Sequence, residues 1–201
     1  MQKQNPTEYP VHDFIRDRWS PRAFSSASVP PEVLRSLFEA ARWAPSSNNE
    51  QPWAFLVARR EDPESHAKLL STLVESNRLW AQQAPVLALA VSELEFARGG
   101  QPNRNAYYDT GAALAYLTVE ATARGLFVHQ MAGFDPQRAR ELLHIPKGWD
   151  PISAFVIGAL GDPQSLPEKL RERERKPGTR KPLGTFVLGG SWGEPAPFLK
   201  A

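Results

Sequence analysis

The hydrophobic and polar positions of this 201-residue chain follow two periodicities, one typical of helices and one typical of buried strands. Apolar residues recur at helical spacing over 33–41, after two prolines and a glutamate that suit a helix N-terminus, and Pro45 ends the pattern. Apolar runs at 53–59, 86–92 and 152–160 predict three buried strands. Helical and strand patterns therefore alternate along the chain.

Three further segments, 63–77, 105–124 and 136–145, have the spacing of helices. The longest ends at Gly125, a residue type that favours the turn after a helix. Small residues in this longest segment leave two interpretations open, packing inside the core of one subunit or close approach of a second helix. These residues are Gly111, Ala112, Ala113 and Ala115.

The composition is that of an ordinary globular domain, with 41% hydrophobic and 23% charged residues, and we expect one domain over 1–201. The absence of cysteine excludes disulfides, thiolate nucleophiles, cysteine-bound zinc and iron–sulfur clusters. Any redox chemistry must therefore come from a bound cofactor. No apolar run approaches the ~20 residues that span a membrane, so we expect a cytoplasmic protein with no membrane partner.

The net charge of +2 raises the question of a nucleic-acid partner. The densest basic run, at 168–181, is interleaved with glutamates, which is typical of a solvated helix face, so we expect no nucleic-acid binding. We also expect no metal site, because the four histidines are scattered without the spacing of metal ligands. They are His12, His66, His129 and His144.

A Pro-bounded loop at 45–52 is the most informative stretch for chemistry. It concentrates two hydroxyl and three carboxamide side chains between the first predicted helix and the first predicted strand. Such side chains present hydrogen-bond donors and acceptors side by side, which is what the uracil-like edge of a flavin ring requires. The loop therefore predicts a flavin-binding protein.

A second motif, RWSPR at 18–22, supplies groups that suit a phosphate. Its proline disfavours a regular helix, and in an extended chain Arg18, Ser20 and Arg22 share one face. Two guanidinium groups beside a hydroxyl fit a phosphate dianion, because charge-assisted hydrogen bonds are about twice as strong as neutral ones. A short arginine-rich segment is also commonly just solvated, so this motif alone does not decide between the two interpretations.

The order of the two motifs and the helix between them resembles the FMN-dependent nitroreductase family. The resemblance continues over nearly the whole chain, through EAARWAPSSNNEQPW, ESNRLWAQQAP, YYDTGAALAYLTVEATARGLF, MAGFD, FVIGALGDP and TRKPL. It implies an α+β fold, a three-layer α/β/α sandwich with a mixed, mainly antiparallel central sheet. It also implies a homodimer centred on the longest helix. The segment at about 162–201 lacks periodicity, which disorder would also explain. By the resemblance it would be an extended C-terminal arm that crosses the partner subunit.

The resemblance also implies the cofactor and its ligands. FMN would carry hydride from NAD(P)H to a nitroaromatic, quinone or related small electrophile in a ping-pong cycle, with no catalytic side chain. Phosphate contacts would come from Arg18, Trp19, Ser20, Arg22 and Arg180. The flavin ring would be held by Pro45, Ser46, Ser47, Asn49 and Gln51, in part from the neighbouring subunit, and by Asn77, Ala132 and Gly133.

Two positions depart from the family pattern. Trp80 stands where members often carry a basic residue, and Gly178 stands where they often carry another. Fewer positive charges imply a lower flavin reduction potential or weaker phosphate binding. Two alternatives to the reductase remain open at this point: a specialised flavin enzyme of the same fold, for dehalogenation, enone reduction or flavin breakdown, and a non-catalytic flavin-binding protein.

Overall fold

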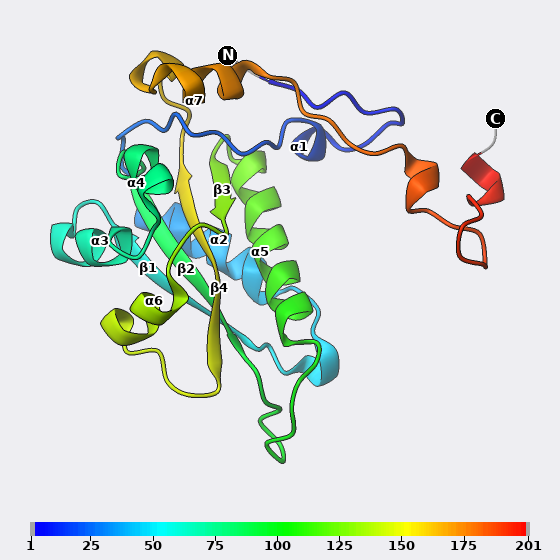
Figure 1. Ribbon diagram of the computed structural model, residues 1–201, viewed down its shortest axis with the longest axis horizontal. Coiled ribbons are helices and arrows are strands. Elements are labelled where there is room, and N and C mark those ends of the chain that lie inside the picture. Colours follow the sequence, from blue (N-terminus) through cyan, green and yellow to red (C-terminus); the bar gives the residue numbers. More distant parts are fainter. Residues whose placement is uncertain (1–2, 200–201) are drawn as a thin grey trace.

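The computed structural model describes residues 3–199 and is built around a four-stranded sheet with the order β1-β2-β4-β3 (Figure 1). The strands are β1 (Trp53–Arg59), β2 (Val86–Glu93), β3 (Phe127–Met131) and β4 (Trp149–Gly158). All three strand pairings described within residues 3–199 are antiparallel. The antiparallel character of the sheet that the family resemblance implies is confirmed, but the described residues contain no parallel pair of the kind that a mixed sheet has.

Helices cover both faces of this sheet, as Figure 1 shows. One face is packed by α2 (Pro31–Arg42) and α5 (Ala106–Ala123), and the other by α3 (Pro63–Leu70), α4 (Glu75–Ala81) and α6 (Pro136–Leu143). Alternate residues of β2 point to two separate cores, Val86 and Ala88 to the α2–α5 side, Leu87 and Leu89 to the other. The expected three-layer α/β/α arrangement is therefore present.

The small residues of the longest helix, α5, lie in two different environments. Ala113 is fully buried against α2 and the sheet, as the core-packing interpretation requires. Gly111 and Ala115 instead lie on an exposed face of α5, beside Tyr108, which is 79% exposed. The helix ends as predicted, with Gly125 in the left-handed region at φ 72°.

Some expected elements differ from the observed ones. The predicted helix at 63–77 is two helices, because the Ser71 and Thr72 hydroxyls bond back to the Lys68 and Leu69 carbonyls, and Leu73 then pairs with Phe134.

The predicted buried strand at 53–59 is an edge strand and only half buried, with Val57 exposed. Strand β3 and the one-turn helix α1 (Asp13–Arg16) were not predicted, since five and four residues are too short to establish a period.

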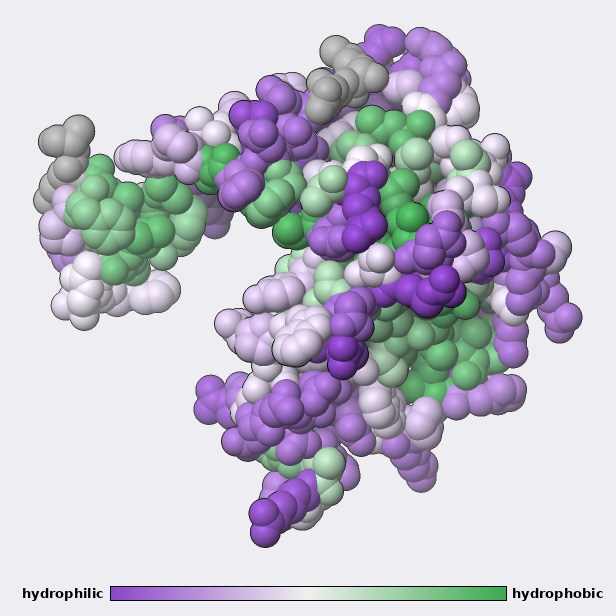
Figure 2. Space-filling model, turned by 180° about the vertical axis from the view of Figure 1, so that it is seen from behind, coloured by the Kyte–Doolittle hydropathy of each residue, from purple (hydrophilic) through white to green (hydrophobic). Residues whose placement is uncertain are grey.

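The C-terminal segment leaves the sheet after β4. It forms α7 (Glu168–Arg175) and then runs away from the body of the molecule (Figure 1). Short 3-10 turns occur at Pro163–Ser165, Leu183–Thr185 and Pro197–Leu199. Apolar side chains gather at the far end of this arm (Figure 2), where Trp192 is 95% exposed and Phe198 is also exposed.

Candidate functional site

The amide-rich loop has an unusual backbone. Asn48, Asn49 and Gln51 all lie in the left-handed region, with φ of 53°, 57° and 52°. Side chains other than glycine disfavour this region, and such conformations gather where the surrounding structure holds them for function. The short 3-10 helix η1 (Ser47–Asn49) accommodates two of them. The loop is therefore strained as well as polar.

Three hydrogen bonds hold this strained loop in place. The buried carboxylate of Asp109, in the first turn of α5, accepts from the Ser47 N–H at 3.0 Å. The Ser46 hydroxyl accepts from the Gln51 N–H at 3.0 Å, and Glu50 accepts from the Ala97 N–H at 2.9 Å. Asp109 therefore acts as the structural anchor of the loop.

The RWSPR segment has the predicted alternation of faces. The Trp19 ring packs edge-on against Phe127 in the core, while Arg18 donates to the Ser20 hydroxyl at 3.4 Å. Burial lowers the pKa of Arg18, and the positive charge of Arg180, from the C-terminal arm, lowers it further. Three of the predicted phosphate ligands are therefore neighbours.

Arg22 completes a positively charged cluster. Burial lowers the pKa of its guanidinium, Glu174 opposes this shift and Arg173 adds to it. None of the ion pairs formed among residues 3–199 involves Arg18, Arg22 or Arg180. Arg18 and Arg22 are partly buried guanidiniums that form no ion pair within the described residues, and such groups favour an anionic ligand. We call Arg18, Ser20, Arg22 and Arg180 the arginine cluster.

His129, on β3, supports this cluster from below. Its Nδ1 lies 2.6 Å from the Pro21 carbonyl oxygen, so Nδ1 carries the proton and donates. Burial, together with the charges of Arg22 and Arg18, lowers the pKa of His129 to about 4, although its backbone hydrogen bonds oppose this. The sequence offers no signal for this role, because the contact spans 108 residues.

Trp80, the departure from the family pattern, packs beneath the same segment. It is 2% exposed, and its ring lies 4.5 Å from that of His129 and 6.3 Å from that of Phe24. The position that is often basic in the family is therefore an apolar wall in this chain. The other departure, Gly178, lies against the Asn5 side chain, where an added Cβ would come within 3.0 Å of Oδ1.

Asn77 and Gly133 form a second polar contact, one helical turn from Trp80. The Asn77 amide donates to the Gly133 carbonyl at 2.9 Å, and the Val74 N–H donates to the same oxygen at 3.1 Å. A Cβ on Gly133 would lie 2.6 Å from Asn77 Nδ2, so only glycine permits this approach. Ala132 beside it is exposed.

The amide-rich loop lies away from these groups within one subunit. It sits at the N-terminal end of α5, where Asp109 anchors it, whereas residues 18–22 cross the opposite end of the molecule (Figure 1). One subunit thus brings together the arginine cluster and, through Trp80 and His129, the Asn77–Gly133 pair. The amide-rich loop, which holds the predicted flavin-ring residues of 45–51, lies at the other end of α5 and is not part of this group.

Glu174 is a further residue that the sequence pattern misplaced. The basic and acidic alternation of α7 predicted a solvated face, and most of the helix is exposed, but Glu174 is buried. Its carboxylate accepts from the backbone N–H groups of Arg22 and Ala23, a contact that no local pattern indicates. We call residues 18–23, the RWSPR segment with Ala23, the phosphate segment.

No helix within residues 3–199 is long and apolar enough to cross a membrane. Over the same residues, no three histidine, aspartate or glutamate side chains gather as metal ligands would.

Known proteins match this chain over most of its length. A solved structure described as an oxidoreductase containing FMN has 37% identity and a TM-score of 0.89, covering 94% of this chain and 96% of that chain. The NADH dehydrogenase of Thermus thermophilus is 31% identical over 202 residues, covering 85% of this chain and 91% of its own. The FMN reductase [NAD(P)H] of Bacillus subtilis is 28% identical over 165 residues, 74% of this chain and 65% of its own.

A family model gives the classification directly. The model described as the Nitroreductase family matches residues 15–159, which is well over half of the chain. The matched region contains the RWSPR segment, the amide-rich loop and the Asn77–Gly133 pair. The chain therefore belongs to the nitroreductase family.

Proposed function

We propose that this protein is an FMN-dependent NAD(P)H oxidoreductase that delivers hydride to a nitroaromatic, a quinone or a related small electrophile in a ping-pong cycle. The observation that carries the proposal is the arginine cluster, whose guanidiniums form no ion pair among residues 3–199, together with the polar Asn77–Gly133 pair. The names of the relatives, an oxidoreductase containing FMN and an FMN reductase [NAD(P)H], support it.

The residues present fit FMN. Arg18, Arg22 and Arg180 offer charge-assisted hydrogen bonds to a phosphate. Because Asn77 Nδ2 is taken by Gly133, Asn77 Oδ1 stays available as an acceptor for a ring N–H, and no residue among 3–199 donates to it. A positively charged site for a phosphate, together with an amide oxygen that can accept from a ring N–H, matches the two polar ends of flavin mononucleotide.

FMN, when bound, supplies the hydride chemistry at N5 of its ring. The chain itself contributes binding and orientation. The guanidiniums would hold the phosphate, Asn77 and the amide-rich loop would orient the ring, and the buried Trp80 would exclude water beneath the RWSPR segment. Because the chain has no cysteine, no thiolate takes part.

We further propose a cytoplasmic homodimer in which the amide-rich loop of each subunit meets the flavin held by the other subunit's arginine cluster. The separation of these two groups within one subunit supports this arrangement. So do the exposed Gly111, Ala115 and Tyr108 face of α5 and the apolar side chains of the arm. The chain would form one domain, with 162–201 as an arm that packs on the partner.

The test begins with purified protein. It should show the absorbance band of oxidised flavin, and anaerobic NADH or NADPH should bleach it. Flavin that neither donor bleaches would indicate a flavin-binding protein without turnover, and a protein that takes up no FMN would refute the proposal.

The phosphate site has its own test. Arg22→Ala should weaken FMN binding by about 1.5–3 kcal/mol, roughly ten- to a hundredfold, and leave riboflavin affinity little changed. Arg35→Ala, which removes the same charge from an exposed position of α2, is the matched control. Equal losses of FMN and riboflavin affinity in Arg22→Ala would show that the phosphate binds elsewhere.

A further inference from the structure

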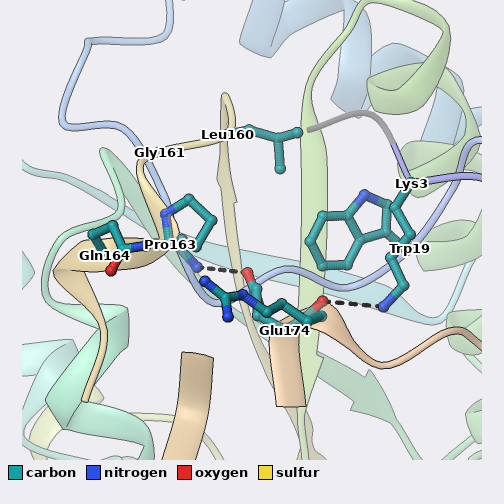
Figure 3. A pocket seen from close by; sticks show the side chains of 9 residues that line it. Lys3, Trp19, Leu160, Gly161, Pro163, Gln164 and Glu174 are labelled. Carbon is teal, nitrogen blue, oxygen red and sulfur yellow. Dashed lines mark hydrogen bonds between the residues drawn. The ribbon is translucent and has the colours of Figure 1, made fainter. Parts of the chain in front are cut away.

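Glu174 makes an unusual contact between the C-terminal segment and the phosphate segment. Its Oε1 accepts from the backbone N–H of Arg22 at 2.8 Å and from that of Ala23 at 3.0 Å. The contact joins residues more than 150 positions apart. Figure 3 shows the Glu174 side chain reaching from α7 to this backbone.

The Glu174 carboxylate is committed to these two N–H groups. It is 5% exposed, and its other oxygen, Oε2, has no hydrogen-bond partner among residues 3–199. Lys3 forms no ion pair with this carboxylate; its Nζ donates to the Glu174 main-chain carbonyl at 3.2 Å and lies over the Trp19 ring (Figure 3). Because one side-chain oxygen bridges two consecutive backbone N–H groups, the position of that oxygen fixes the position of the backbone at 22–23.

The position of this contact in the chain links two parts of the proposed site. On one side, Arg22 is itself a member of the arginine cluster. On the other, Glu174 is in the last turn of α7, six residues before Arg180. A hydrogen bond between main-chain groups, from the Gly161 N–H to the Ala23 carbonyl at 2.8 Å, also holds this segment against the residues that follow β4.

We propose that Glu174 is a positioning residue for the cofactor phosphate. Resting on the proposed function above, this assigns to its carboxylate the task of holding the backbone at 22–23 so that Arg18 and Arg22 face the phosphate. Phosphate binding would then also depend on the position of α7, the helix at the start of the C-terminal arm, because Glu174 lies in its last turn. What matters is the reach of the acceptor more than its charge.

Two conservative variants separate reach from charge. Glu174→Asp keeps the charge but withdraws the carboxylate by one methylene, whereas Glu174→Gln keeps the length and an acceptor oxygen but loses the charge. Glu172→Asp, at an exposed position of the same helix, is the matched control. The readout is the ratio of riboflavin to FMN dissociation constants, which isolates the phosphate contribution, measured by fluorescence quenching on the full-length protein.

We expect the ratio to fall roughly tenfold in Glu174→Asp and to change by less than about threefold in Glu174→Gln and in the control. An unchanged ratio in Glu174→Asp would overturn the proposal, even if the variant were less stable, because a purely structural role affects both ligands equally. A fall in Glu174→Gln alone would also overturn it, since charge would then be decisive. A wild-type protein with no preference for FMN over riboflavin would instead refute the proposed phosphate site itself.

Discussion

Gln51 has a backbone conformation that its own side chain disfavours, which makes a glycine substitution informative. At φ 52° a residue with a Cβ is strained by roughly 1–2 kcal/mol, and glycine is not. Glycine also loses more chain entropy on folding, about 0.5–1 kcal/mol. In addition, Gln51→Gly removes the exposed bond from Gln51 Nε2 to the Asn49 carbonyl, 3.0 Å long and worth about 0.5 kcal/mol.

A matched variant cancels the entropic term. Gln101 is also an exposed loop glutamine, but its φ is not positive, so Gln101→Gly gains nothing from strain relief. With a strain of about 1.5 kcal/mol and a lost bond of about 0.5 kcal/mol, the apoprotein of Gln51→Gly should be more stable than that of Gln101→Gly by about 1 kcal/mol.

Urea denaturation of the two apoproteins measures this difference, and FMN titration measures its functional consequence. We expect Gln51→Gly to bind FMN on the order of fivefold more weakly than wild type, because the side chain that we propose contacts the flavin is gone. The strain would then serve binding at the expense of stability. Equal destabilisation of the two glycine variants would refute the strain argument.

The remaining predictions concern pH, assembly and chemistry. The pKa of His129 falls from 6.5 to about 4 on folding. Between these pH values the unfolded chain takes up a proton that the folded protein does not, so the stability present above pH 6.5 is lost as the pH falls towards 4. It amounts to about 3 kcal/mol, and urea denaturation at pH 7 and pH 4 should show a smaller pH dependence in His129→Gln than in wild type. Truncation after Asp162 should disrupt both the dimer and flavin binding, and light scattering that found a stable FMN-loaded monomer would contradict this. Single changes of Asp109, His129 or His144 should not abolish flavin reduction in folded, FMN-loaded protein, and stopped-flow mixing that showed no reduction in one of them would establish an indispensable acid or base.

Much of the architecture follows from local sequence patterns. The run over 86–92 predicted the central strand, since a strand buried on both faces is apolar at every position. The pattern over 33–41 predicted α2, and Gly125 marked the end of α5. Shorter elements such as β3 escaped prediction, because five residues present too few positions to define a period.

The chemical character of the site was also determined by the sequence. The hydroxyls and carboxamides of 45–52 and the arginines of RWSPR are side-chain types whose donors, acceptors and charges do not depend on folding. Even the alternation of Trp19 with Arg18 and Ser20 could be predicted, since neighbouring residues of an extended chain point to opposite sides.

Only the tertiary structure decided how these groups are placed. The left-handed conformations at 48, 49 and 51 lie in a loop that Asp109, 62 residues along the chain from Ser47, holds in place. His129 and Glu174 reach the phosphate segment across 108 and about 150 residues, and their surroundings turn a scattered histidine and a charged helix residue into buried supports. Local propensity acts over a few residues, whereas burial and hydrogen-bond partners are set by segments that meet only when the chain has folded.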